Sequence, residues 1–347
     1  MLKSFCSFIG KGRTMINLAI NGFGRIGRSI MRVALEREDV QIVAINDVAD
    51  WEILTYLLEH DSTHQKLPYA VDYQNHTLCF DFDMCPPIHT LSYSRSEDID
   101  FKALGADIVI ESSGHFLQTS QLTHHLQKDV QKVILSASAL DSMPTFIKGI
   151  NEKHYQGEKI ISNSSCTANA IAPICKILHD AFGIESATLT TIHSYTNDQS
   201  LLDSVYTKDK RRSRAAAQNI IPTSTGAAKE VMRVLPHLLG KLHGYSVRVP
   251  VSNIVLFDMS FTLCKPTTTE ILNETLSKAS ENEMFGVVGI DTREGVSSDF
   301  INSPYSVVIA QDLSHVFQGN IARVMAWCDN EWGYAHRILD LAALIGK

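Results

Sequence analysis

The stretch INLAINGFGRIGRSI, residues 16–30, decides the fold of the first half of this 347-residue chain. Its first five residues are mostly apolar and predict a buried strand, and the apolar periodicity after the glycines predicts a helix. Gly22 permits a tight turn, Gly24 lets the backbone approach a pyrophosphate, and Gly27 lets the helix pack closely on the strand. The N-terminus of such a helix attracts phosphates. The stretch therefore predicts the opening of a dinucleotide-binding fold.

An acidic residue follows the next predicted strand at the distance that such folds require. Residues 40–46 predict a second strand, which ends at Asp47, twenty residues after Gly27. A carboxylate at this place binds the ribose hydroxyls of the adenosine and repels a 2′-phosphate, so it favours NAD over NADP. The alternative is that Asp47 caps the N-terminus of the helix expected near Trp51.

Strands and helices alternate up to about residue 165. Residues 107–111 and 132–136 are apolar runs that predict buried parallel strands, and residues 116–127 between them have a helical pattern. Serines end both strands, at 112–113 and at Ser136, where ligands of doubly wound sheets bind, although ordinary turns also use serine. Residues 15–165 are therefore predicted to form an α/β Rossmann-type dinucleotide-binding domain.

The bulk composition excludes several classes of protein. Hydrophobic residues make up 44% of the chain and charged residues 20%, as in ordinary globular proteins, and no apolar run approaches the ~20 residues that span a bilayer. A net charge of −7 argues against nucleic acid as the main partner. The seven cysteines include no CxxC pair, so neither a disulfide framework nor a metal site is predicted, and a reducing cytoplasm fits best.

The first fourteen residues precede the first convincing strand. They are apolar only in part and too short in their apolar run for a secretory signal. Residues 1–14 are therefore predicted to be a dispensable leader extension.

Cys166 is the candidate nucleophile of the sequence, because it stands at the predicted start of a helix. The run SNSSCTANA, residues 162–170, is a polar turn that ends at this cysteine, and a helical apolar pattern follows it. A thiolate is favoured at a helix N-terminus, and a nucleophilic cysteine needs a base such as His193, which ends the strand-like run 188–193. The alternative is that Cys166 is a small core residue.

The pattern after this helix changes. Longer strands are predicted at residues 186–194, 245–251 and 254–263, with less regular helices between them. This predicts an α+β catalytic domain, residues 166–329, around a mixed or antiparallel sheet. The basic run at residues 206–214 is interpreted as a solvated loop or a subunit contact.

With these residues in view, the chain resembles the phosphorylating glyceraldehyde-3-phosphate dehydrogenases. The matching stretches occur in family order and are residues 20–28, 162–169, 191–199, 221–229, 248–250 and 327–334. The resemblance covers the chain from Met15 to its end. It implies that a helix at residues 330–347 packs back on the dinucleotide-binding domain, and that the protein is a homotetramer in which residues 195–214 reach a neighbouring subunit.

The resemblance also implies a mechanism. Cys166 would attack the aldehyde of glyceraldehyde 3-phosphate, His193 would act as the base, and inorganic phosphate would release 1,3-bisphosphoglycerate from a thioester. Thr196 and Arg248 match the site for the substrate's phosphate. The residues that match the inorganic phosphate site are Ser165, Thr167, Thr225 and Gly226. The predicted cofactor-binding residues are Gly22, Gly24, Arg25, Ile26, Gly27, Asp47, Ser136, Asn330 and Tyr334.

The chain departs from the family pattern at three places. Ala168 and Ala170 stand where the family usually has a second threonine and a second cysteine. The second cysteine is not needed for the chemistry. Val48 and the pair Val205-Tyr206 stand where strict NAD enzymes tend to have leucine and Leu-Pro, so NADP use stays open.

Three other functions compete with this interpretation. An erythrose-4-phosphate dehydrogenase would share the cysteine, the histidine and the glycines, but residues 194–198 and 223–226 follow the glyceraldehyde-3-phosphate pattern. A non-phosphorylating aldehyde dehydrogenase fits less well, because it would not need a second anion site. The other class is a secondary RNA- or protein-binding role, which a Cys166→Ser variant would leave intact.

Overall fold

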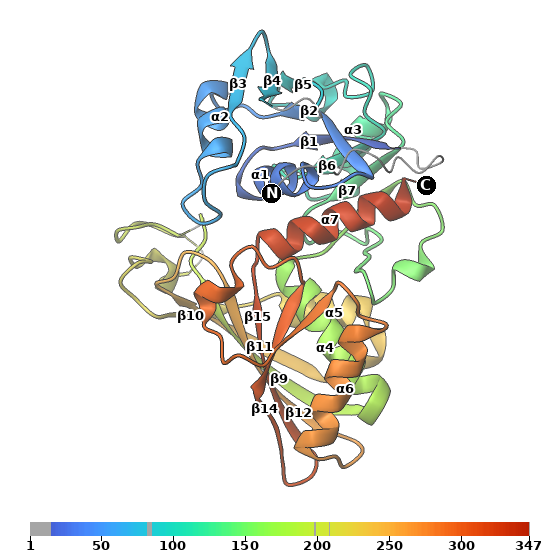
Figure 1. The fold of residues 1–347 in the computed structure, drawn as a ribbon, viewed down its shortest axis with the longest axis vertical. Helices are drawn as coiled ribbons and strands as arrows, with labels where there is room; N and C mark the ends of the chain where they lie inside the picture. Colours follow the sequence, from blue (N-terminus) through green and yellow to red (C-terminus); the bar gives the residue numbers. More distant parts are fainter. Residues whose placement is uncertain (1–14, 82–84, 198, 208, 347) are drawn as a thin grey trace, which may run out of the picture.

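The computed structural model describes residues 15–81, 85–197, 199–207 and 209–346. The chain forms two sheets, one above the other in Figure 1, with the C-terminal helix α7 (Trp332–Ile345) lying between them. The predicted leader lies outside the described residues.

The first sheet has eight strands in the order β3-β4-β5-β2-β1-β6-β7-β8. Its strands are β1 (Ile16–Asn21), β2 (Val40–Asn46), β3 (Val71–Gln74), β4 (Thr77–Phe80), β5 (Ile88–Leu91), β6 (Ile108–Glu111), β7 (Lys132–Leu135) and β8 (Ile160–Ser162). Strands β5, β2, β1, β6, β7 and β8 are parallel, and β3 and β4 extend the sheet in antiparallel fashion. The predicted doubly wound sheet is confirmed.

Helices cover both faces of this sheet, which explains its nearly continuous apolar strands. Leu18 and Ile20 of β1 face a core shared with α1 (Arg25–Ala34), α2 (Trp51–Glu59) and α7. Ala19, between them, faces the opposite core, to which α3 (Thr119–Leu126) contributes Leu122. Helix α3 starts later than the predicted residue 116, because the Gln121 side chain accepts the Gln118 N–H at 3.1 Å and so closes the helix start.

The second sheet has seven strands in the order β10-β11-β9-β12-β15-β14-β13. Its elements in chain order are α4 (Cys166–Phe182), β9 (Ile184–Ser194), β10 (Ile221–Ser224), α5 (Ala227–Val234), β11 (Leu242–Val249), β12 (Val255–Leu263), α6 (Thr269–Glu281), β13 (Val288–Asp291), β14 (Val307–Phe317) and β15 (Ile321–Cys328). Parallel pairs occur at β11/β9 and β13/β14, and the other neighbours are antiparallel. The predicted mixed sheet is confirmed.

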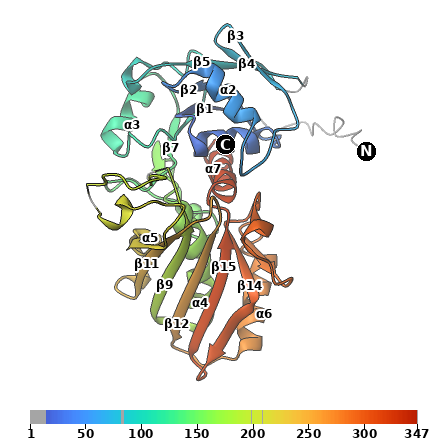
Figure 2. The same ribbon diagram turned by 90° about the vertical axis from the view of Figure 1, so that its left-hand side faces the viewer.

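The helices of this half lie on one face of the sheet, behind the strands in Figure 2. Residues of β12 are buried and half-buried in strict alternation, as expected for a sheet with one packed face. Short 3-10 helices occur at Ser96–Asp98, Glu152–His154, Arg211–Ser213, Pro236–Leu238 and Ser297–Phe300.

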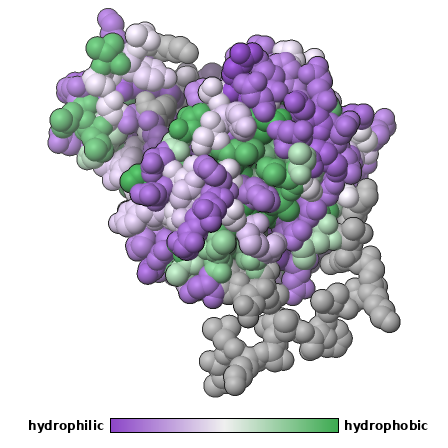
Figure 3. Space-filling model, turned by 90° about the horizontal axis from the view of Figure 1, so that it is seen from above, coloured by the Kyte–Doolittle hydropathy of each residue, from purple (hydrophilic) through white to green (hydrophobic). Residues whose placement is uncertain are grey.

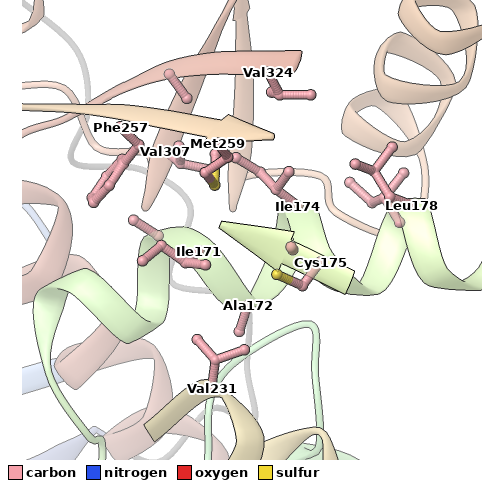
Figure 4. Close-up of a cluster of buried hydrophobic side chains, with 14 of the residues drawn as sticks. Ile171, Ala172, Ile174, Cys175, Leu178, Val231, Phe257, Met259, Val307 and Val324 are labelled. Carbon is pink, nitrogen blue, oxygen red and sulfur yellow. The ribbon is translucent and has the colours of Figure 1, made fainter. Parts of the chain in front are cut away.

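Helix α4 is the central helix of the second core. In Figure 4, Ile171 and Ile174 point toward Phe257 and Met259 of the sheet. On the other side of the helix, Ala172 faces Val231 of α5 in the same buried cluster. This packing fixes the helix axis and therefore the place of its first residue, Cys166.

Helix α4 and strand β9 run in opposite directions, so two residues that are distant in the sequence come to the same end of the domain. The helix is 17 residues long and so runs about 24 Å, and it ends at Gly183, whose φ of +71° reverses the chain. Strand β9 then runs back, and its first ten residues span about 30 Å. Its residue His193 therefore lies at the level of the helix start at Cys166.

Figure 3 looks onto the end of the molecule that is at the top of Figure 1 and shows a largely hydrophilic surface, with hydrophobic residues near the middle and at one side of the view. Helix α2 carries exposed apolar side chains, among them Ile53 and Tyr56. Among the described residues, no helix has the length and apolar character needed to cross a membrane.

Candidate active site

Cys166 is the first residue of α4, as the sequence pattern predicts. Ser165 caps the helix, because its hydroxyl accepts the N–H of Ala168 at 3.2 Å. The residue before the cap, Ser164, is fully buried and has a φ of +57°. Cys166 itself is half-buried. The thiol therefore stands at a helix N-terminus and follows a turn of unusual backbone conformation.

Burial raises the pKa of the Cys166 thiol above its ordinary value. Contact with Thr167, whose Oγ1 lies 3.9 Å from the sulfur, and the positive charge of Arg248 act in the opposite direction without overcoming it. Burial thus favours the neutral thiol, against the helix N-terminus and Arg248, which favour the thiolate. A base that takes the proton is required before the sulfur can act as a nucleophile.

His193 and Arg248 lie side by side on neighbouring strands, since the register of β9 and β11 pairs them directly. Nδ1 of the buried His193 lies 2.7 Å from the Ser194 carbonyl oxygen, which can only accept, so Nδ1 carries the proton. Nη1 of Arg248 donates to the same carbonyl at 2.8 Å and lies 3.0 Å from Nδ1. Because a guanidinium cannot accept a hydrogen bond, the 3.0 Å between Nη1 and Nδ1 is a contact between two donors that share the Ser194 carbonyl oxygen. This tautomer places the imidazole lone pair on Nε2, which is therefore the basic nitrogen of the ring.

The predicted anion-binding residues fall into two groups. Arg248 donates to the Thr196 hydroxyl at 3.2 Å, so these two residues, far apart in sequence, are brought together. Thr225 and Gly226 precede α5, where the Thr225 hydroxyl accepts the Ala227 N–H at 3.2 Å. Both groups present N–H or guanidinium donors of the kind that bind phosphate.

The glycine turn after β1 fits a dinucleotide. Gly22 has a φ of +96°, and a Cβ there would lie 2.4 Å from the Ser113 backbone. A Cβ on Gly27 would lie 2.2 Å from the Gly22 carbonyl oxygen, so this glycine allows the close crossing of helix and strand. A Cβ on Gly24, in contrast, would meet nothing within 4 Å. The backbone beside Gly24 is thus open to a ligand, while Arg25 and Ile26 begin the helix behind it.

Asp47 lies beside this turn. One of its carboxylate oxygens accepts the Phe23 N–H at 2.6 Å and the other accepts the Ala49 N–H at 2.9 Å. The cap of α2 is instead Asp50, which accepts the Ile53 N–H at 3.0 Å. The alternative interpretation of Asp47 as the helix cap is therefore wrong.

Four other predicted cofactor residues use their side chains within the protein. The Ser136 hydroxyl donates to the Glu111 carbonyl at 2.9 Å, and Tyr334 donates to the Ser164 carbonyl at 2.7 Å. The guanidinium of Arg25 pairs with Asp61 at 2.5 Å and with Glu331. Arg25 is the first residue of α1, so its backbone N–H is one of the donors that the helix itself leaves unused at its start. The Asn330 side chain accepts from the Ser194 hydroxyl at 3.3 Å and so adjoins the histidine strand.

Several residues around the site have no local sequence signal. Ser164 donates to Glu230 of α5 at 2.9 Å, and His64 lies 3.0 Å from Glu331. A serine in a polar turn and a glutamate on a helix surface look ordinary in sequence. Ser164 and Glu331 fall within stretches on which the resemblance rests, at residues 162–169 and 327–334, whereas Glu230 and His64 do not. Among the described residues, no group of three or more His, Cys, Asp and Glu could hold a metal ion.

Comparison with known proteins assigns both halves of the chain. Residues 16–119 match the family described as "Glyceraldehyde 3-phosphate dehydrogenase, NAD binding domain", and residues 165–330 match its C-terminal domain. The chain is 46% identical to glyceraldehyde-3-phosphate dehydrogenase of Helicobacter pylori, over 94% of this chain and 98% of that protein. It is 42% identical to glyceraldehyde-3-phosphate dehydrogenase 1 of Bacillus subtilis and to the enzyme of Geobacillus stearothermophilus, in both cases over 96% of this chain and 98% of the relative.

These matches cover nearly the whole of each relative and include the glycine turn, the cysteine turn and the histidine strand. The chain belongs to the glyceraldehyde-3-phosphate dehydrogenase family.

Proposed function

We propose that the chain oxidises glyceraldehyde 3-phosphate with NAD and inorganic phosphate to 1,3-bisphosphoglycerate and NADH, the phosphorylating step of glycolysis and gluconeogenesis. The observation that carries the proposal is the convergence at one end of the second sheet. Cys166 begins α4 there, and the charge of Arg248, which contacts His193, acts on its thiol. Family membership supplies the substrate class.

The two groups of anion donors suit a substrate and a second reactant that are both phosphates. Thr196 and Arg248 would bind the phosphate at C3 of the substrate. Inorganic phosphate would bind at Thr225 and Gly226, at the start of α5, together with Ser165 and Thr167 beside the nucleophile. A non-phosphorylating dehydrogenase has no use for the second group.

The chemistry follows from the position of each group. Once His193 has taken the thiol proton at Nε2, the sulfur of Cys166 attacks the aldehyde carbon, and His193 returns that proton to the oxyanion, which gives a hemithioacetal and a neutral histidine. When bound, NAD supplies a nicotinamide ring that accepts a hydride. His193 then accepts the hydroxyl proton while the C–H bond of the hemithioacetal is lost as hydride, which leaves a thioester on Cys166. Inorganic phosphate attacks the thioester carbon, and the C–S bond breaks to regenerate the thiolate.

NAD is the cofactor that the matched NAD-binding domain and Asp47 support. An acid beside the adenosine ribose repels a 2′-phosphate. Use of NADP as a second cofactor remains part of the proposal, because Val48 and the pair Val205-Tyr206 depart from the strict NAD pattern.

The proposal extends to organisation and location. We assign residues 15–165 and 330–347 to the NAD-binding domain and residues 166–329 to the catalytic domain. The protein would act in the cytoplasm as a homotetramer, with residues 195–214 at a subunit contact and without nucleic acid as a main partner. The pairing of α7 with buried residues of α1 supports the assignment of the C-terminal helix.

Initial rates with glyceraldehyde 3-phosphate test the function. NADH formation should depend strongly on inorganic phosphate or arsenate, and NAD should outperform NADP. The Cys166→Ser variant should lose more than about 10³-fold in kcat while still binding NAD. Phosphorylating turnover by that variant would refute the mechanism. Oxidation of erythrose 4-phosphate in place of glyceraldehyde 3-phosphate would move the protein to the sister activity.

A further inference from the structure

Ser164, two residues before the nucleophile, has a backbone conformation that a residue with a side chain rarely adopts. Its φ is +57°, it is fully buried, and it joins the end of β8 to the cap of α4. Such a conformation persists in a folded protein only where the surroundings hold it. Because Ser165 and Cys166 follow directly, a change in the Ser164 backbone would redirect the thiol.

Three elements hold Ser164 in this conformation. Its N–H donates to the Ser162 hydroxyl at 2.9 Å, and its carbonyl accepts from the Tyr334 hydroxyl of α7 at 2.7 Å. Its own hydroxyl donates to the Glu230 carboxylate of α5 at 2.9 Å. Each polar group of Ser164 therefore has a partner, and two of these partners come from helices far away in the sequence.

Tyr334 lies close enough to both Cys166 and Glu230 for their charges to act on its phenol. Burial, together with the negative charges of Cys166 and Glu230, raises the pKa of Tyr334 well above its usual value. The phenol therefore keeps its proton and donates to the Ser164 carbonyl at neutral pH. Glu230 also lies in the first turn of α5, one helical turn after Gly226.

We propose that Glu230 is a positioning residue for the phosphorylating reaction, which acts through the Ser164 hydroxyl to hold Cys166 in its attacking orientation. This inference rests on the proposed role of Cys166 as the nucleophile. Glu230 would also connect the sites of the two substrates. It lies on α5, whose start would bind inorganic phosphate, and it accepts a hydrogen bond from the turn that precedes Cys166. A misplacement of about 1 Å at a nucleophile costs up to about 10²-fold in rate.

The test measures the reactivity of Cys166 in two ways. The first is the rate of alkylation by iodoacetamide without substrate, followed by the mass of the peptide that contains Cys166. The second is the rate of the NADH burst without phosphate, which reports formation of the thioester. The variants are Glu230→Ala, Glu230→Gln, Ser164→Ala and the double variant Ser164→Ala/Glu230→Ala.

Glu230→Ala should lower the burst rate about tenfold, with the KM for NAD changed by less than about twofold. Glu230→Gln keeps an oxygen that accepts from Ser164, so it should recover to within about threefold of the wild type. Ser164→Ala should resemble Glu230→Ala. The double variant should be no slower than either single variant, because both remove the same contact.

Two results would overturn the proposal: a burst rate in Glu230→Ala equal to that of the wild type, or single effects that multiply in the double variant. If Glu230→Ala does not fold, Glu230→Asp serves in its place, since its shorter side chain cannot reach the Ser164 hydroxyl. Failure of the proposed function is separable. A wild type that does not oxidise glyceraldehyde 3-phosphate would refute that function, while the alkylation rates would still decide whether Glu230 positions Cys166.

Discussion

Two turns at the same edge of the first sheet connect a strand to a helix, and they are built in opposite ways. The glycine turn joins β1 to α1, and the cysteine turn joins β8 to α4. Each contains one residue with positive φ, Gly22 at +96° and Ser164 at +57°. In the first turn glycine needs no support, whereas in the second a serine is held by Glu230 and Tyr334.

The difference follows from what each turn presents. A phosphate is bound by backbone N–H groups, so the glycine turn needs close backbone packing on one side and open space on the other, which Gly22 and Gly24 provide. A nucleophile must be aimed along one direction, so the cysteine turn needs side-chain contacts from other elements. The first turn is therefore specified locally, and the second depends on the tertiary structure.

The largest expected effect comes from removing His193, the residue proposed as the base for Cys166 in the cysteine turn. His193→Asn should lower kcat about 10²- to 10⁴-fold, the range for loss of a general base. Since burial raises the pKa of Cys166 and the base no longer takes its proton, the midpoint of iodoacetamide alkylation against pH should move upward. Alkylation rates measured between pH 5 and 10 provide the check. An unchanged midpoint would mean that His193 does not share the proton of Cys166.

The glycine turn allows a matched pair of substitutions. Gly22→Ala should destabilise the protein by about 1–3 kcal/mol, because it combines a positive φ with a Cβ 2.4 Å from the Ser113 backbone. Gly24→Ala, whose Cβ meets nothing within 4 Å, should change stability by about 1 kcal/mol or less. Its methyl group should instead weaken NAD binding about tenfold, equivalent to about 1.4 kcal/mol.

Urea unfolding and NAD titration measure the two quantities. Equal stability losses in both variants would show that the turn is not divided into a packed side and a ligand side. Equal NAD affinities for Gly24→Ala and the wild type would place the pyrophosphate elsewhere.

A third substitution makes the cysteine turn resemble the glycine turn. In Ser164→Gly the positive φ no longer costs energy, while the hydrogen bond to Glu230 is lost, and each of these terms is about 1 kcal/mol. Stability should therefore stay within about 1 kcal/mol of the wild type, although Cys166 alkylation slows. Chemical denaturation beside alkylation rates separates these results. A variant as reactive as the wild type would show that the backbone alone aims the thiol.

The same contrast explains what the sequence could predict. Local periodicity and spacing predict β1, α1, β2 and the helix that begins at Cys166, and all four elements are confirmed. The β3, β4 and β5 strands were not predicted because, unlike the equally short β6 and β7, none of them contains a continuous run of buried apolar residues. The contacts of Ser164 and of Arg25 join residues 66 and 306 positions apart, so no local pattern reports them.

The smallest predicted effect concerns a buried cluster that connects the two halves near Asn330. Nδ1 of His64 lies 2.6 Å from the Asn302 side-chain oxygen and Nε2 lies 3.0 Å from Glu331, so the protonated ring can donate from both nitrogens. Burial by itself lowers the pKa of His64, but Glu331, Asp329 and Asn302 outweigh it and raise that pKa above the ordinary 6.5.

A raised pKa means that the folded protein binds this proton more tightly than the unfolded chain. Its contribution to stability is therefore complete below pH 6.5 and is lost as pH rises through the folded value. The free energy of unfolding of the wild type should therefore fall more than that of His64→Gln between pH 6 and pH 9. Urea titrations of both proteins at the two pH values test this, and the variant subtracts the other titrating groups. Parallel losses in the two proteins would mean that His64 does not gain a proton on folding, and that Arg25 and Glu331 hold the two halves together without it.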